Sequence, residues 1–215
     1  MVVVTMRADA RRNLEQLLAA ARDLVAEKGA GVALDEVAHR AGVGIATLYR
    51  RFPDRSALLR GVVLDALEQT RLAAEQAAEE HDDAFEALAA YLRAALELRV
   101  SAVIPQVLDA LDLDEPELAT ACEASARATE RLVDAAHEAD SLPADVTFAD
   151  VGMMLVRIAR PLPGPMPEEL KHELARRHLE LFIRGLGGEH RSLDGPELSR
   201  ADLADLAHPG NTLSG

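Results

Sequence analysis

The chain has 215 residues, of which 49% are apolar but only 3% aromatic, and its formal net charge is −14. Its single cysteine, Cys122, excludes an intrachain disulfide, and no apolar run reaches the ~20 residues that a membrane-spanning helix needs. Because alanine and leucine dominate whereas strand-forming aromatic residues are scarce, the composition favours an all-α fold.

The charge is divided unevenly along the chain. Residues 1–60 contain 10 Lys and Arg against 7 Asp and Glu, a net charge of +3, whereas the rest contain 13 against 30, a net charge of −17. This asymmetry is typical of a small polyanion-binding part joined to an acidic body. The apolar start, Met1 to Val4, lacks the basic region of a signal peptide, so we expect a cytoplasmic protein with no membrane partner.

Two short helices follow a longer one near the start of the chain. Apolar residues at helical spacing predict a first helix over 9–28, namely Leu14, Leu17, Leu18, Ala21, Leu24 and Val25. A second helix over 34–41 ends at Gly42, where the missing side chain permits a left-handed backbone. A third helix covers 45–51. This arrangement is typical of a helix-turn-helix.

The rest of the chain also follows a helical pattern. Pro53 ends the third helix, because the residue before a proline disfavours the α conformation, and Asp54 is placed to cap a fourth helix that reaches about residue 80. Five more helices are predicted at 83–99, 102–111, 116–139, 147–160 and 168–186. Residues 187–215 are rich in Gly, Pro, Ser and Asp, and we expect them to form a flexible tail.

The segment VALDEVAHRAGVGIATLYRRFPDRSALL (32–59) resembles the DNA-binding domain of TetR-type transcriptional repressors. The resemblance is carried by a helix ending in Ala-Gly-Val (41–43), a short helix closing on Thr-Leu-Tyr (47–49), and Phe-Pro-Asp-Arg (52–55). It implies a DNA-binding domain over 1–60 and a helical-bundle domain for effector binding and dimerisation over 61–186. One departure is Ala33, which occupies the cap before the second helix and weakens it by roughly 1 kcal/mol relative to Ser or Thr.

A short helix fits the major groove with its first residues facing the base edges. Gly44 permits close approach of the backbone, Ile45 and Ala46 are suited to thymine methyl groups, and Thr47 reaches a phosphate or a base edge. The resemblance implies that Tyr49 and Arg55 bind phosphates. The basic side chains nearby extend the positive surface, so the candidate DNA-binding residues are Gly44, Ile45, Ala46, Thr47, Tyr49, Arg50, Arg51, Arg55, Arg11 and Arg12.

The acidic helical part suits an apolar or amphipathic small molecule, because few aromatic residues fill the space between its helices. Candidate residues for an effector pocket are Tyr91, Arg99, Gln106, His137, Met154 and Arg157. Apolar stripes on the last two predicted helices are typical of a four-helix dimer interface, with candidates Val151, Leu155, Ile158, Leu170, Leu174, Leu181 and Phe182. The resemblance thus implies a homodimeric repressor that binds operator DNA and leaves it when a small-molecule effector binds.

Two short stretches of the sequence are similar to enzyme motifs. Asp82 to Glu86 is similar to an Mg²⁺-binding diphosphate motif, but no second acidic cluster accompanies it in a helical context. Glu36-x-x-His39 matches one element of a di-iron bundle and lacks a second copy. No zinc spacing or phosphate loop is present, so we expect no enzyme, no metal and no cofactor. A transcriptional activator or a helical protein-binding module of the same fold remains as the alternative.

Overall fold

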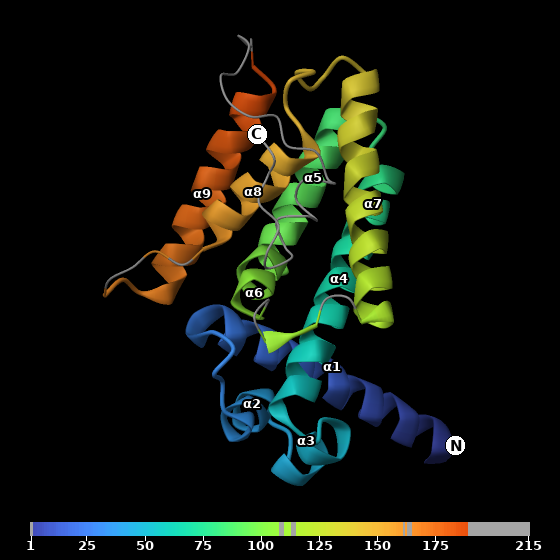
Figure 1. The fold of residues 1–215 in the computed structure, drawn as a ribbon, viewed down its shortest axis with the longest axis vertical. Helices are drawn as coiled ribbons and strands as arrows, with labels where there is room; N and C mark the ends of the chain where they lie inside the picture. The colour runs from blue at the N-terminus through green and yellow to red at the C-terminus, as the bar shows by residue number, and fades with distance from the viewer. Residues whose placement is uncertain (1, 108–109, 113–114, 161, 163–164, 189–215) are drawn as a thin grey trace. The chain divides into compact units, whose positions relative to one another are not determined.

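The computed structural model describes residues 2–107, 110–112, 115–160, 162 and 165–188. Within these ranges the chain forms helices and no strand, which confirms the all-α prediction (Figure 1). The helices are α1 (Val2–Lys28), α2 (Leu34–Ala41), α3 (Ile45–Arg51), α4 (Arg55–Glu80), α5 (Ala84–Glu97), α6 (Val100–Val107), α7 (Pro116–Glu138), α8 (Phe148–Ala159) and α9 (Glu168–Leu186). Most of the tail predicted over 187–215 lies outside the described residues, which end at residue 188.

The chain forms two compact units. Of the described residues, unit 1 contains 2–68 and the stretch within 102–121, and unit 2 contains 69–101 and the stretch within 122–188. Unit 1 therefore holds α1, α2, α3 and the start of α4, together with most of α6 and the beginning of α7. Unit 2 holds α5, α8, α9 and the remaining parts of α4, α6 and α7.

Local sequence signals set the boundaries of the helices in unit 1. Gly42 has φ = 65°, and the N–H of Val43 donates to the carbonyl of Ala38 at 3.0 Å, so α2 ends in the left-handed turn that the sequence predicted. Ala33 forms no side-chain cap bond, as expected. Asp54 accepts a hydrogen bond from the N–H of Ala57 at 2.8 Å and thereby caps α4. The helix-turn-helix is confirmed.

Two helices differ from the predicted boundaries. α1 begins at Val2 instead of near residue 9, because residues 2–8 contain neither glycine nor proline to interrupt it. α6 begins at Val100, directly after Arg99, whose φ of 54° turns the chain in a way that L-residues rarely adopt. Two residues, Leu98 and Arg99, thus separate α5 from α6.

The core of unit 1 fixes the orientation of α3. Leu48 is fully buried among the side chains of the neighbouring helices, where Leu17, Leu24, Val37 and Leu58 are also inaccessible to solvent. Phe52, directly after α3, packs against Gly61 of α4, because a Cβ atom added at Gly61 would lie 2.7 Å from the Phe52 ring. Leu48 in the middle of α3 and Phe52 directly after it thus hold the short helix against the core.

We expect Gly61→Ala to destabilise the protein by about 1 kcal/mol, although alanine is the better helix former. Alanine gains about 1 kcal/mol in helix propensity, whereas displacing the buried Phe52 ring costs about 1–3 kcal/mol. Gly152→Ala in α8 is the matched control, because nothing lies within 4 Å of its added methyl group, and it should stabilise the protein. Urea unfolding of both variants measures the difference, and stabilisation by both would contradict the packing described.

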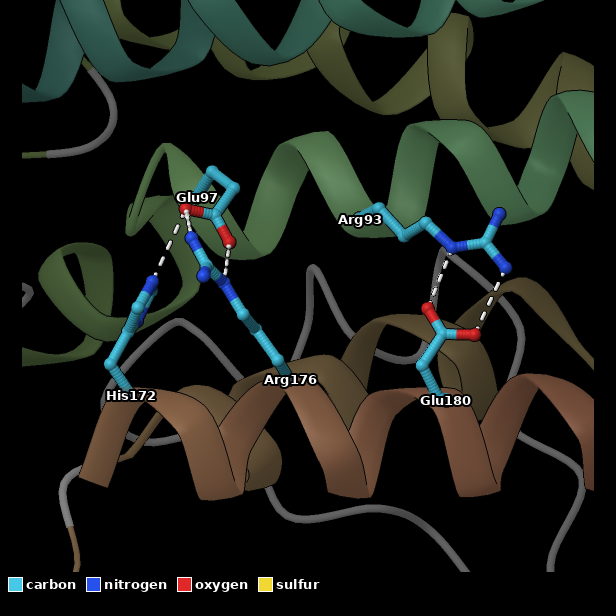
Figure 2. Close-up of polar contacts among 5 residues, drawn as sticks. All are labelled: Arg93, Glu97, His172, Arg176 and Glu180. Atoms are coloured by element: carbon cyan, nitrogen blue, oxygen red, sulfur yellow. Dashed lines mark hydrogen bonds and ion pairs between the residues drawn. The ribbon is translucent and has the colours of Figure 1, made fainter. Parts of the chain in front are cut away.

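Unit 2 has a core drawn from α4, α5, α7, α8 and α9, with Leu88, Leu92, Leu132 and Leu179 among its buried side chains. Ion pairs join α5 to α9 along the edge of this core (Figure 2). The Nε of Arg93 donates to Glu180 at 2.7 Å, and the Nε of Arg176 donates to Glu97 at 2.7 Å. His172 Nε2 lies 3.2 Å from the second oxygen of Glu97. Hydrogen bonds from Arg176, reinforced by His172, lower the pKa of Glu97.

Glu97→Gln should reduce the free energy of unfolding at pH 7 by less than about 1 kcal/mol, because the pair is partly exposed. In the wild type the pKa of the Glu97 carboxyl is lower in the folded chain than its ordinary value of 4.5. Glu97 therefore stabilises the fold above that pH, and this contribution is lost as the pH falls. The wild type and the variant should therefore converge in acid. Urea midpoints between pH 7 and about pH 3 test this, with Glu79→Gln on α4 as the control; a constant difference would contradict the assignment.

Candidate nucleic-acid interface

α3 presents two different faces. Leu48 points into the core, whereas Ile45 and Tyr49, one turn apart, remain 41% and 47% exposed. Gly44, Ala46, Arg50 and Arg51 are exposed as well, and Thr47 is half-buried. A large isoleucine and a tyrosine left in solvent beside two arginines form a surface suited to a polyanion with apolar groups between its charges.

The arginines near this surface differ from the other described arginines of unit 1 in their lack of a described carboxylate partner. Among the described side chains, none forms an ion pair with Arg12, Arg50, Arg51 or Arg55. Arg11 pairs with Glu15 at 2.9 Å, one turn further along a solvent-exposed part of α1. We name the set formed by Arg12, Tyr49, Arg50, Arg51 and Arg55 the basic face.

Other cations of unit 1 are neutralised locally. Arg22 binds Asp65 at 3.0 Å and Arg40 binds Glu27 at 2.8 Å. Arg60 donates from Nε to Glu115 at 2.7 Å and also binds Glu117, and Lys28 binds Glu36. The hydrogen bonds that Arg60 donates to Glu115 and Glu117 raise the pKa of Arg60. Among the described side chains of unit 1, the uncompensated positive charge is therefore concentrated on the basic face.

The beginning of α4 adds a second feature that favours anions. Arg55 is the first helical residue and is exposed, and the first turn of α4 contains no acidic side chain. The first N–H groups of a helix lack acceptors within the helix, and the helix dipole is positive at this end. Asp54 satisfies the N–H of Ala57, which leaves the N–H of Arg55 and Ser56 for a phosphate oxygen.

Residues of both enzyme-like motifs take part in contacts within the fold. Asp83 accepts a hydrogen bond from the N–H of Glu86 at 2.9 Å, so the acidic stretch around it is the N-cap of α5. Glu36 is engaged with Lys28 on the surface of unit 1. In the part of the chain that the structure describes, no group of three or more His, Cys, Asp or Glu side chains is arranged to hold a metal ion.

The predicted effector-pocket residues lie in different environments. Tyr91 is buried in unit 2, its hydroxyl 2.9 Å from that of Thr129, and burial raises its pKa. His137 Nε2 lies 3.1 Å from the carbonyl oxygen of Pro143 and 3.0 Å from that of Val146, so this nitrogen carries the proton. The other candidates are half-buried Arg99 and exposed Gln106, which belongs to unit 1, and exposed Met154 and Arg157 on α8.

The predicted dimer residues divide into an interior and an exterior set. Val151 and Leu155 are buried within unit 2, where they contribute no exposed area. Ile158, Leu174 and Phe182 are half-buried, whereas Leu170 and Leu181 are 42% and 56% exposed. Met153 and Met154 are 43% and 39% exposed on α8, and Met153 was not predicted for this surface. The helical spacing identified the stripe on α8 but not which side of it faces the chain's own core.

The chain is similar to known proteins over most of its length. Residues 17–62 match the model for bacterial regulatory proteins of the tetR family, and residues 83–188 match the C-terminal domain of SbtR-like transcriptional regulators. No curated protein sequence matches the chain. No helix among the described residues has the length and apolar character needed to cross a bilayer.

Solved structures of TetR regulators are also similar to this chain. A TetR regulatory protein of Mycobacterium vanbaalenii is 31% identical, with a TM-score of 0.59 over 85% of this chain and 99% of that one. The regulator SCO0520 of Streptomyces coelicolor is 27% identical, with a TM-score of 0.61 over 82% of this chain and 99% of that one. LfrR of Mycobacterium smegmatis, solved with proflavine, shares the fold at 24% identity, with a TM-score of 0.57 over 79% and 95% of the two chains.

Proposed function

The chain belongs to the TetR family of bacterial transcriptional regulators, and we propose that it is a repressor that binds operator DNA as a homodimer and is released by a small-molecule effector. In this proposal α3 enters the major groove, and the basic face binds the flanking phosphates. Repression follows when the bound protein covers a promoter. The site of action is the cytoplasm, where bacterial DNA lies.

The observation that carries the proposal is the contrast between the two groups of cations in unit 1. Arg22, Arg40 and Arg60 each bind a carboxylate of their own chain. Arg50 and Arg51 on α3 and Arg55 at the start of α4 have no such partner among the described side chains. Phosphates supply the missing anions. An acidic protein with a net charge of −14 binds DNA only through a local surface of this kind.

Dimerisation is proposed from geometry and from exposed apolar surface. Two reading helices must meet successive major grooves, which are about 34–36 Å apart along the duplex. Met153 and Met154 on α8, with Leu170 and Leu181 on α9, form the apolar surface that we assign to the partner. We name these four residues the dimer face. Pairing α8 and α9 of two chains gives a four-helix bundle.

Release by an effector requires a ligand that prefers a different arrangement of the two reading heads. Such a ligand lowers DNA affinity by the ratio of its affinities for the two arrangements. The complex of the similarly folded LfrR with proflavine supports a small-molecule effector of this kind for the present chain. In unit 2 the buried hydroxyls of Tyr91 and Thr129 are the polar groups that an otherwise apolar ligand would meet.

The experiment is selection of bound duplexes from a random pool with the full-length protein, followed by transcription from a promoter that carries the selected sequence. Reduced transcript supports the repressor, and increased transcript supports the activator. Compounds are then tested for release of the labelled duplex, with proflavine as the first probe. Absence of any enriched sequence would overturn the proposal and favour the protein-binding module.

A further inference from the structure

The exposed residues at the beginning of α3 carry little hydrogen-bonding capacity. Gly44, Ile45 and Ala46 are all exposed and have no side-chain donor or acceptor, and the hydroxyl of half-buried Thr47 is the first polar group. Bidentate readout of guanine or adenine requires Arg, Lys, Asn or Gln, so these four positions cannot supply it. Sequence preference at this end of α3 must have another physical source.

Ile45 supplies an apolar source of sequence preference. The Ile45 side chain remains 41% exposed, whereas Leu48, the other large aliphatic residue of α3, is completely buried. Thymine is the natural DNA base that presents a methyl group in the major groove, at C5. Resting on the proposed function, we infer that Ile45 selects thymine by packing against this methyl group, so that the operator half-site carries thymine where the beginning of α3 meets the groove.

The start of α2 does not offer a competing readout. Its first turn contains exposed Asp35 and half-buried Glu36, which phosphates repel, and Glu36 is bound to Lys28. Arg50 and Arg51 lie at the other end of α3, beyond the apolar positions. The apolar contact at Ile45 is thus distinct from the phosphate contacts proposed for the arginines, and its contribution is separable by mutation.

The test removes the methyl group from the DNA and the side chain from the protein. Each thymine of the selected duplex is replaced in turn by uracil, which lacks only that methyl group. Burial of one methyl group changes affinity by about fourfold, so we expect a loss of about that size at one or two positions per half-site. Restoring the methyl group as 5-methylcytosine, in a duplex with cytosine at that position, should regain affinity by a similar factor.

The same series is then repeated with Ile45→Ala, which should bind thymine and uracil duplexes equally at those positions. Leu72→Ala is the matched control, because Leu72 is 43% exposed on the part of α4 in unit 2, and it should retain the full preference. Indifference of the wild type to uracil, or a preference that persists in Ile45→Ala, would overturn the inference while leaving DNA binding intact. Absence of sequence-specific binding would overturn the proposed function with it.

Discussion

Replacing Arg51 and Arg55 together with alanine is expected to lower operator affinity by about thirtyfold at ~0.15 M salt. Each arginine that contacts a phosphate releases about one counterion, so the slope of log affinity against log salt should fall by about two. Both side chains are exposed, and neither has an ion-pair partner among the described residues, so folding should be unaffected. Fluorescence anisotropy across a salt series measures both quantities.

The control for this variant is the pair Arg127→Ala and Arg131→Ala, which removes the same net charge from α7, where these side chains are 65% and 64% exposed. It should leave the salt slope unchanged. An equal loss in both double variants would mean that overall charge, and not the basic face, attracts the DNA. An unchanged slope in the Arg51 and Arg55 variant would remove both residues from the phosphate contacts.

Introducing glutamate at both Leu170 and Leu181 should convert the proposed dimer to a monomer and reduce operator affinity ~10-fold or more relative to the wild type. Each carboxylate buried without a partner costs several kcal/mol, and a symmetric dimer buries two copies of each. Four such charges raise the dissociation constant of the dimer by at least about a thousandfold. Sedimentation velocity at micromolar concentration measures the oligomeric state.

Leu72→Glu is the control for the dimer face, because Leu72 is similarly exposed on α4. It should remain a dimer and keep its affinity for the operator. Circular dichroism should show that both variants retain their helical content, since Leu170 and Leu181 contribute little to the core of their own chain. A monomeric variant that still binds the operator with wild-type affinity would contradict the proposed arrangement of two reading heads.

Helix positions were predictable because their signals are local. Gly42 in the left-handed region, Asp54 as a cap and Thr147 in a capping box with Asp150 all act within a few residues of one helix end. The close approach of Phe52 to Gly61 was not predictable, because nothing near Gly61 in the sequence indicates which side chain will face it.

The candidate nucleic-acid interface was only partly predictable from the sequence, because it depends on contacts between residues that are distant along the chain. The positions on α3 follow from the motif, but whether an arginine is free depends on partners far along the chain, as in Arg22 with Asp65 and Arg60 with Glu115. Likewise, the periodicity of α8 predicted an apolar stripe that included Val151. Which part of that stripe the chain covers with its own residues depends on how α8 packs in unit 2.

The ion pairs of Arg60 with Glu115 and Glu117 bear on how this protein can be dissected. They join α4 to the beginning of α7 within unit 1. On α6 the side chain of Gln106 also lies close to Gly29, because a Cβ atom added at Gly29 would be 3.4 Å from its side-chain oxygen. A chimera that contains only residues 1–68 of this chain would therefore lack these contacts of the DNA-binding unit with α6 and α7. The DNA-binding unit is discontinuous in sequence, so a chimera that keeps its native specificity must include both segments of unit 1.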